Sequence, residues 1–296
     1  MGQLECYESA SEVLNKLLRV SSNDTQIFRQ TTQIGAASAC ILEEEIGIDI
    51  KSESELVYVQ VDGSMLLTRE ERWKEVKVGR VFCESAIYEE NHQRGWIKSS
   101  QYLAHLGDHE VFEMKMCRLV DSYAELGQRL VFVMDGAKWI RNWVTADYPQ
   151  ALQILDFYHA LEHLAEFAKL YFKNDLERDY WIEENRIRLL QSTVYEVIEV
   201  IKNLEVSSEK LQKEKERLLN YYKSNAYRMN YKQYMEEGLT IGSGAIEAAH
   251  RTVIQKRMKL SGQRWSKQGA QNMLNLRALH LSDRWEQVVG IIRKAA

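Results

Sequence analysis

Two apolar runs that each end in Asp-Gly constrain the fold of this chain most strongly. The first, ELVYVQVDG, is rich in β-branched and aromatic residues and ends at Asp62-Gly63. It predicts a strand that presents a carboxylate at its C-terminal end. The second, RLVFVMDG, is almost continuously apolar and ends at Asp135-Gly136. Such a run is typical of a buried parallel strand, so the pair favours an α/β fold.

The segments around these runs extend the same pattern. WKEVKVGRVFCESAIY alternates apolar and polar residues and is expected to pair with the first strand, and SSQYLAHLG is a candidate third strand. Residues 109–126 have a helical period, and so do residues 138–145 and 157–172, on either side of the short strand ALQILD. The expected order is therefore three strands, followed by helix, strand, helix, strand and helix.

Residues 174–236 differ in character, because they contain neither glycine nor proline and are dense in Glu, Lys, Leu and Tyr. They predict two or three long amphipathic helices that interrupt the α/β core. The segment beginning IGSGAIEAAH predicts a last helix, with Ser243 or Gly244 as its cap and Gly262 as its end. The predicted domains are a short helical N-terminal segment (1–50), a core with a mixed sheet (51–173), an all-helical insertion (174–237) and the final core helices (238–296).

The N-terminal segment is open to two interpretations. Residues 7–30 predict one or two short helices, and VSSNDTQIFRQ fits the turn and second helix of a helix-turn-helix, with Ser22 or Asp24 as N-cap. This would make the segment a remnant of a DNA-binding region. Ordinary packing helices explain the same residues.

Composition indicates a protein of the cytoplasm. The four cysteines lie far apart without a C-x-x-C pair, which fits a reducing compartment and argues against a zinc ribbon. The N-terminus lacks the pattern of a signal peptide, and no apolar run approaches the ~20 residues of a membrane helix. The formal net charge of −4 does not by itself predict a nucleic-acid partner, so local charge decides.

Asp62, Asp135 and Glu247 are the candidate catalytic carboxylates. Two aspartates at the carboxyl ends of neighbouring strands repel each other unless a cation neutralises them, and oxygen ligands suit Mg²⁺ or Mn²⁺. With Glu247 from the last helix they would hold two ions roughly 3.5–4 Å apart, which activate a water or a 3′-hydroxyl against a phosphodiester. Asp-Gly is also common in turns, so an interpretation of both aspartates as turn residues stays open.

Positive charge is concentrated directly after Glu247. No acidic residue interrupts residues 251–267, and a solvated helix face would normally mix charges of both signs. The stretch therefore indicates contact with DNA phosphates. Its candidate residues are Arg251, Lys256, Arg257, Lys259, Arg264 and Lys267. Trp265 is expected either to stack on a base or to pack internally, and His250 is more readily explained as a solvent-facing neighbour of Glu247 than as part of a metal site.

The segment DFYHALEH matches the H-x-x-E-H pattern of zinc peptidases through His159 and His163. Histidines at i and i+4 share a helix face, so a zinc site is geometrically possible. A peptidase would also need a third ligand, and the sequence does not single one out. A coincidental match in which both imidazoles only pack or hydrogen-bond is an equally open interpretation.

Several linked motifs resemble the catalytic region of bacterial DDE transposases of the ISKra insertion-sequence type. They are YVQVDGSML, WKEVKVGRVF, VFVMDGAKWI, QILDFYHALEHL, IGSGAIEAAHRTVIQKRMKLSGQRWS and GAQNMLNLRAL, in order from about residue 50 to residue 281. The resemblance implies an RNase H-like core split by a helical insertion, with the DDE triad at Asp62, Asp135 and Glu247 and with Mg²⁺ as cofactor. Related enzymes carry an Asp/Cys-x-x-His motif, which Asp156-Phe-Tyr-His159 matches. This implies that His159 lies near the scissile phosphate or braces the catalytic strand.

The resemblance implies an enzyme that cleaves the ends of a mobile element and transfers the strands into target DNA, as a homodimer associated with the nucleoid. The sequence departs from the family pattern before the first strand, where such transposases usually carry a longer, often cysteine-rich DNA-binding region. The alternative is therefore an inactive or truncated transposase remnant that acts as a DNA-binding or interaction protein.

Overall fold

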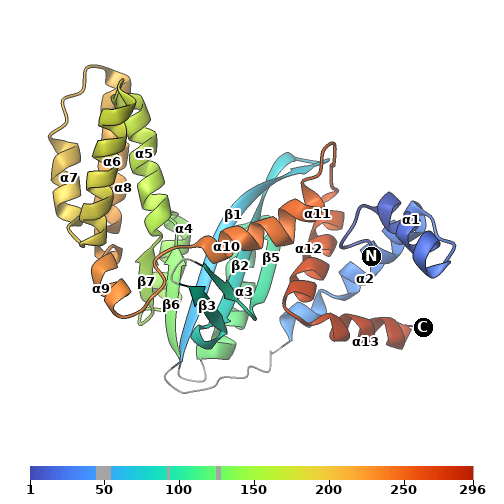
Figure 1. The fold of residues 1–296 in the computed structure, drawn as a ribbon. Helices are drawn as coiled ribbons and strands as arrows, with labels where there is room; N and C mark the ends of the chain where they lie inside the picture. Colours follow the sequence, from blue (N-terminus) through green and yellow to red (C-terminus); the bar gives the residue numbers. More distant parts are fainter. Residues whose placement is uncertain (45–54, 92–93, 125–127, 296) are drawn as a thin grey trace. The chain divides into compact units, whose positions relative to one another are not determined.

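The computed structural model describes residues 1–44, 55–91, 94–124 and 128–295 (Figure 1). The chain divides into two compact units, which we call the first and the second unit. The first unit consists of Met1–Leu130 and Gly244–Ala296, and the second of Val131–Ser243. The predicted boundary between residues 50 and 51 lies outside the described residues, and the other predicted domain boundaries stay predictions.

Three antiparallel strands form the centre of the first unit. Their order is β5-β2-β1, and the register places Val78 between Asp62 on one side and Ala104 on the other. A separate hairpin pairs β3 with β4. The strand bounds are β1 (Leu56–Thr68), β2 (Arg72–Cys83), β3 (Ile87–Asn91), β4 (Arg94–Ile97) and β5 (Gln101–Leu106). The two long strands and the third strand predicted from alternation are thereby confirmed.

Helices cover both faces of these strands. Val76 and Val78 point to one face, where they are buried in a cluster with Ile246 and Val253. Gly79 points to the opposite face, since successive side chains alternate, and a side chain there would collide with Met116 of α3. The helices of this unit are α1 (Tyr7–Leu18), α2 (Asp24–Ala37), α3 (His109–Ala124), α10 (Gly244–Ala249), α11 (Lys256–Met258), α12 (Lys267–Leu281) and α13 (Trp285–Ala295). A π-helical segment, His250–Gln255, joins α10 to α11, and short 3₁₀ turns occupy Cys40–Glu43 and Glu84–Ala86.

The second unit combines a parallel strand pair with a group of helices. The strand β6 begins in the first unit and pairs with β7 in parallel, as the continuous apolar run predicts. Helices occupy the stretch in which two or three long amphipathic helices are expected, and Figure 1 shows them in yellow to orange. The elements are β6 (Arg129–Met134), α4 (Lys138–Asp147), β7 (Leu152–Leu155), α5 (Phe157–Tyr171), α6 (Asp175–Leu190), α7 (Val194–Lys202), α8 (Glu209–Asn225), a 3₁₀ turn (Ala226–Arg228) and α9 (Tyr231–Glu236).

Two local predictions are wrong. The first strand does not end at Asp62, because the residues after it continue to pair with β2 as far as Thr68. The N-cap of α2 is Asn23, which forms a capping box with Gln26, and neither Ser22 nor Asp24 takes that position. The helix α10 begins at Gly244, so Ser243 stands at the predicted cap position, and its hydroxyl donates to Asp156.

The protein is thus a mixed α/β structure with both antiparallel and parallel strand pairs. Within the described part of the chain, no helix combines the length and apolar character that crossing a bilayer requires.

Candidate functional site

In the first unit, Asp62 faces the helical segment that carries Glu247. Asp62 is paired with Val78 across the two strands, so both side chains lie on the face covered by that segment. The Nε2 atom of His250 lies 3.2 Å from Oδ2 of Asp62. His250 is only 4% exposed, so the expectation of a solvent-facing histidine is wrong. Residues far apart in the chain therefore meet at this face of the sheet.

Arg80 holds the start of α10 against the strands, two residues before Glu247. Arg80 on β2 is buried, and its guanidinium donates to the carbonyl of Ala245 over 2.7 Å and to the hydroxyl of Ser100 over 2.9 Å. Glu247 itself is exposed and lies one turn before His250. The first unit therefore holds two of the three candidate carboxylates on one side of its sheet, with Glu247 open to solvent and Asp62 beside a buried histidine.

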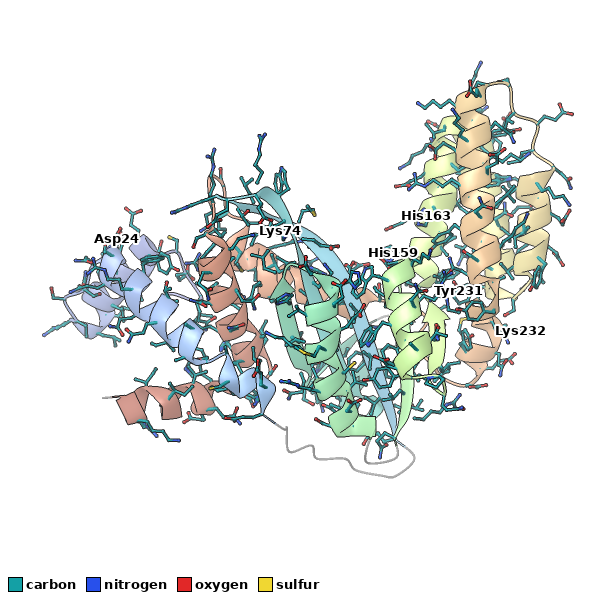
Figure 2. All side chains as sticks on the ribbon, turned by 180° about the vertical axis from the view of Figure 1, so that it is seen from behind. Asp24, Lys74, His159, His163, Tyr231 and Lys232 are labelled. Atoms are coloured by element: carbon teal, nitrogen blue, oxygen red, sulfur yellow. The ribbon has the colours of Figure 1, made fainter. Side chains whose placement is uncertain are left out.

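In the second unit, Asp135 follows the last residue of β6. Its Oδ1 accepts a hydrogen bond from the backbone N–H of Ala137 over 2.9 Å. The glycine after it is required, because a side chain at Gly136 would collide with the ring of Tyr221. Asp135 lines a cavity of about 590 Å³ together with Tyr221, His159 and His163. Figure 2 shows both histidines projecting from α5.

Asp156 lies at the centre of the hydrogen bonds next to this cavity. It is fully buried at the N-cap of α5, and its Oδ1 accepts from the N–H of Tyr158 over 2.7 Å. Its Oδ2 accepts from the backbone N–H of Ser243 over 3.1 Å, from the Ser243 hydroxyl, and from Nδ1 of His159 over 2.9 Å. Burial alone would raise the pKa of Asp156, but the hydrogen bonds from His159 and Ser243 outweigh it and hold that pKa below its ordinary value.

The charge of His159 follows from the same contact. The hydrogen bond to Asp156 raises the pKa of His159 to about 9, against a smaller opposing effect of burial. Its imidazole is therefore a cation at neutral pH. The pKa of His163 is shifted in the opposite direction, because burial lowers it. The centroid of the His163 ring lies 4.1 Å from that of the Tyr221 ring.

The two histidines of the H-x-x-E-H match lie on one helix, α5. Nδ1 of His159 donates to Asp156, which leaves Nε2 for a metal that would displace its proton. Across residues 1–44, 55–91, 94–124 and 128–295, no three His, Cys, Asp or Glu side chains are arranged to hold a metal ion.

The cations of the basic stretch after Glu247 differ in their exposure to solvent. Arg251, Lys256, Lys259 and Arg264 are exposed, and Lys259 donates from Nζ to the hydroxyl of Ser64 over 2.6 Å. Lys267 is half-buried and forms an ion pair with Glu71.

Two members of the stretch turn inward. Arg257 is only 1% exposed, so its side chain does not share the surface of the exposed cations, and its predicted contact with DNA phosphates stays a prediction. Its Nε donates to the carbonyl of Gly2 over 3.0 Å. Trp265 is also buried and donates from its indole N–H to the carbonyl of Met258 over 3.0 Å, so packing is the correct interpretation of that residue.

The sequence motifs did not single out Asp156 as a hub or His250 as a buried partner. Asp156 is the residue that follows β7, just as Asp135 follows β6, and these two strands are parallel neighbours. The carboxyl ends of such strands are where sites form in α/β sheets, so this position was an available signal. The contact of His250 with Asp62 has no comparable signal, because it depends on how the helix and the strand pack.

Comparison with known proteins places the chain in a family. The sequence profile described as the uncharacterised protein family UPF0236 matches residues 3–290. The chain belongs to the UPF0236 family. No curated protein matches this UPF0236 sequence. Among solved structures, the Drosophila P element transposase strand transfer complex is similar, with a TM-score of 0.32 and 11% identity over 95% of this chain and 78% of that chain. A similarity of this size supports no conclusion about fold or function, and the profile does not distinguish the ISKra type.

Proposed function

We propose that this chain is a transposase that cleaves DNA strands at insertion-sequence ends and transfers them into target DNA. The proposal includes an RNase H-like core of the ISKra-type enzymes, a DDE triad of Asp62, Asp135 and Glu247, and action as a homodimer on paired DNA ends at the nucleoid. Its first support is the ordered set of motifs that resembles those transposases over most of the chain.

The observation that carries the proposal is the meeting of Asp62 with the helical segment of Glu247. His250, one turn after Glu247, reaches to 3.2 Å from the Asp62 carboxylate. The Arg80 guanidinium fixes the start of the same segment to β2. These two buried residues, His250 and Arg80, support the proposal that Asp62 and Glu247 act on the same face of the sheet. A chain that used Asp62 only as a turn residue would not need this arrangement, and Asp62 lies within a strand.

The proposed cofactor is a pair of Mg²⁺ or Mn²⁺ ions bound by Asp62, Asp135 and Glu247. The proposal requires these carboxylates to bind the ions together in the complex with DNA. Bound ions would supply activation of the attacking oxygen and charge neutralisation at the phosphate. The protein's own contribution in the second unit is a cationic imidazole, His159, in the same cavity as Asp135. A cation at that position would attract a phosphate oxygen.

The proposed DNA surface consists of the exposed cations Arg251, Lys256, Lys259 and Arg264. Phosphate contacts of this kind release counterions, so binding should weaken with salt. Each substitution of one of these residues by alanine should reduce the slope of log K against log salt by about one. Arg257 should not contribute to that slope as a surface charge, because it is buried.

The decisive experiment is nicking of an end-labelled duplex in the presence of Mg²⁺ or Mn²⁺, with Asp135→Asn as the variant. The account expects nicking by the wild type and its loss in the variant. Asp175→Asn is the matched control, because that side chain is 82% exposed on α6 and should leave nicking unchanged. Duplex binding without nicking by the wild type would instead favour a transposase remnant that only binds DNA.

A further inference from the structure

A second cavity lies in the first unit, and it contains none of the candidate carboxylates. Its volume is about 490 Å³, within the range of about 300–1,000 Å³ that is common for small-ligand sites. Its walls come from the two N-terminal helices, from the turn after β1 and from the chain before α12. Segments from both ends of the sequence therefore build it together.

The floor of this cavity is a buried guanidinium. Arg257 lies between two aromatic rings, with its Cζ 4.8 Å from the centroid of Tyr7 and 5.2 Å from that of Trp265. Its Nε is satisfied by the carbonyl of Gly2, and the hydroxyl of Tyr7 is a further contact. The Nη2 atom is buried and has no hydrogen-bond partner within the described residues. An unpaired N–H donor on a buried cation is costly unless a ligand acceptor satisfies it.

The mouth of the cavity carries two more guanidinium groups. Arg69 and Arg264 are both exposed, and Nε of Arg69 donates to the carbonyl of Arg264 over 3.3 Å, which keeps the two residues adjacent. Among the residues that line the cavity, Asp24 is the one carboxylate, and it is labelled on α2 in Figure 2. Its Oδ1 accepts from the N–H of Thr25 over 2.7 Å. Three arginines against one aspartate leave the cavity positively charged.

An accessible aromatic ring completes the lining. Phe28 is 43% exposed, although most phenylalanines in folded proteins are buried. Its ring packs edge-on against Tyr7, with the centroids 5.4 Å apart. One side of the cavity thus offers a flat apolar surface, while the mouth and the floor offer positive charge and hydrogen-bond donors.

We infer that this cavity binds one unstacked nucleotide of a nucleic-acid strand. The base lies on Phe28 with its acceptor edge toward Arg257, and the phosphate lies at the mouth between Arg69 and Arg264. A nucleotide combines a flat ring, hydrogen-bond acceptors and a negative charge, and these are the three features that the lining complements. Stacking on aromatic rings with cations along the backbone is the general mode by which proteins bind single strands.

The inference goes beyond the proposed reaction. It shares Arg264 with the proposed DNA surface, but it needs neither metal ions nor the three carboxylates. Binding is therefore measured in EDTA, where no nicking is possible. A protein that fails to nick duplex DNA can still bind a strand here, and a nicking enzyme can lack this site, so the two proposals fail separately.

The test uses the full chain and a twelve-nucleotide thymidine strand with one central 2-aminopurine, whose fluorescence reports stacking. The wild type is expected to change that fluorescence on binding. Phe28→Ala should abolish the change and weaken binding roughly 5- to 100-fold, the usual effect of losing one base–aromatic stack. Arg264→Ala should weaken binding about tenfold. Both side chains are exposed, so both variants should fold.

Matched controls separate the cavity from general charge attraction. Arg29→Ala removes an exposed arginine next to Phe28 that does not line the cavity, and it should change binding less than about threefold. Tyr195→Ala removes an exposed ring on α7 and should have no effect.

Competition experiments identify the source of the nucleotide. Displacement by thymidine monophosphate supports a site that also takes free nucleotides, and displacement by strands alone supports a strand site. Equal displacement by inorganic phosphate, or wild-type binding by Phe28→Ala, would overturn the inference.

Discussion

Each of the two units contains an aspartate beside a histidine, and the two pairs are built in opposite ways. In the first unit, Nε2 of His250 lies 3.2 Å from Asp62, the histidine side chain is 6% exposed and the aspartate is 25% exposed. In the second unit, Nδ1 of His159 lies 2.9 Å from Asp156, the aspartate is fully buried and the histidine is 29% exposed. The first pair thus presents its carboxylate toward solvent, and the second presents its imidazole.

This difference assigns different tasks to the two aspartates. Asp156 accepts hydrogen bonds from two residues of its own helix and from Ser243, so its lone pairs are used to hold the chain together. A carboxylate in that state is a structural anchor and a source of charge for His159. Asp62 is partly exposed and stands beside a helix that carries a second exposed carboxylate, so it is the better placed of the two to bind a cation or substrate.

The largest effect is expected from Asp62→Asn. Loss of a proposed metal ligand should lower the rate of Mg²⁺-dependent nicking by about 10³-fold, because transition-state charge is no longer neutralised. The free energy of unfolding should change by less than about 1 kcal/mol, because the carboxylate is partly solvated. Nicking assays and urea unfolding of the same preparation check both parts. A loss of stability with unchanged nicking would show that Asp62 has a structural role and is not a metal ligand.

Asp156→Ala should have the opposite profile. Removing a fully buried carboxylate leaves the Ser243 and Tyr158 N–H groups and the His159 cation without their acceptor. We expect the free energy of unfolding to fall by about 3 kcal/mol. Urea unfolding followed by circular dichroism measures the change. A loss below about 1 kcal/mol would show that Asp156 is not an anchor and would remove the contrast with Asp62.

The second pair should also make stability depend on pH. Because folding raises the pKa of His159 from 6.5 to about 9, its stabilisation is complete below pH 6.5 and is lost as the pH rises through 9. The expected loss is on the order of 2 kcal/mol, reduced from the full pKa difference because the ring is partly exposed. The pKa of Asp156 is lowered, so its stabilisation is present above about 3.8 and is lost as the pH falls through the folded value.

Unfolding in urea at a series of pH values tests this dependence. The control is His159→Gln, which removes the titrating group and should flatten the curve between pH 6.5 and 9. A wild-type curve that is already flat over that range would contradict a protonated His159.

The smallest effect is expected from Ser243→Ala. The variant removes the hydroxyl that donates to Asp156 but keeps the backbone N–H that donates to the same oxygen. We expect a loss of about 1–2 kcal/mol in the free energy of unfolding, typical of a hydrogen bond to a charged group. Ser224→Ala is the matched control, because its exposed hydroxyl donates only to the carbonyl of Tyr221, and it should cost less than about 0.5 kcal/mol. Equal losses of stability in the two variants would contradict the role of Asp156 as a structural anchor for Ser243.

The fold was largely predictable where a local pattern determines it. The apolar runs specify β1, β2, β6 and β7, and the glycine-free stretch specifies α6 to α9. The end of β1 was predicted wrongly because Asp62-Gly63 has the composition of a turn, whereas pairing with β2 carries the strand on to Thr68. The end of β1 is therefore set by pairing with β2 and not by the local composition.

For the candidate site, sequence context and resemblance single out Asp62, Asp135 and Glu247, and these three assignments stay predictions. The burial of Arg257 and His250 was not predictable from the sequence. Both lie in or after the π-helical segment, where the turn differs from that of an α-helix, so α-helical spacing does not predict which side chains face inward. Six positive charges without an acidic neighbour suggested one surface, but the helix turns Arg257 toward the core.

If Asp62, Asp135 and Glu247 act at one site, a double-mutant cycle of Mn²⁺ binding should show it. The full chain, Asp62→Asn, Asp135→Asn and the double variant are titrated with Mn²⁺ in the presence of a DNA duplex. Each single variant should lose most of the Mn²⁺ affinity, and the double variant should lose little more, because both substitutions disable the same site. Independent, additive losses, or unchanged Mn²⁺ affinity in Asp135→Asn, would show that these carboxylates do not share one site.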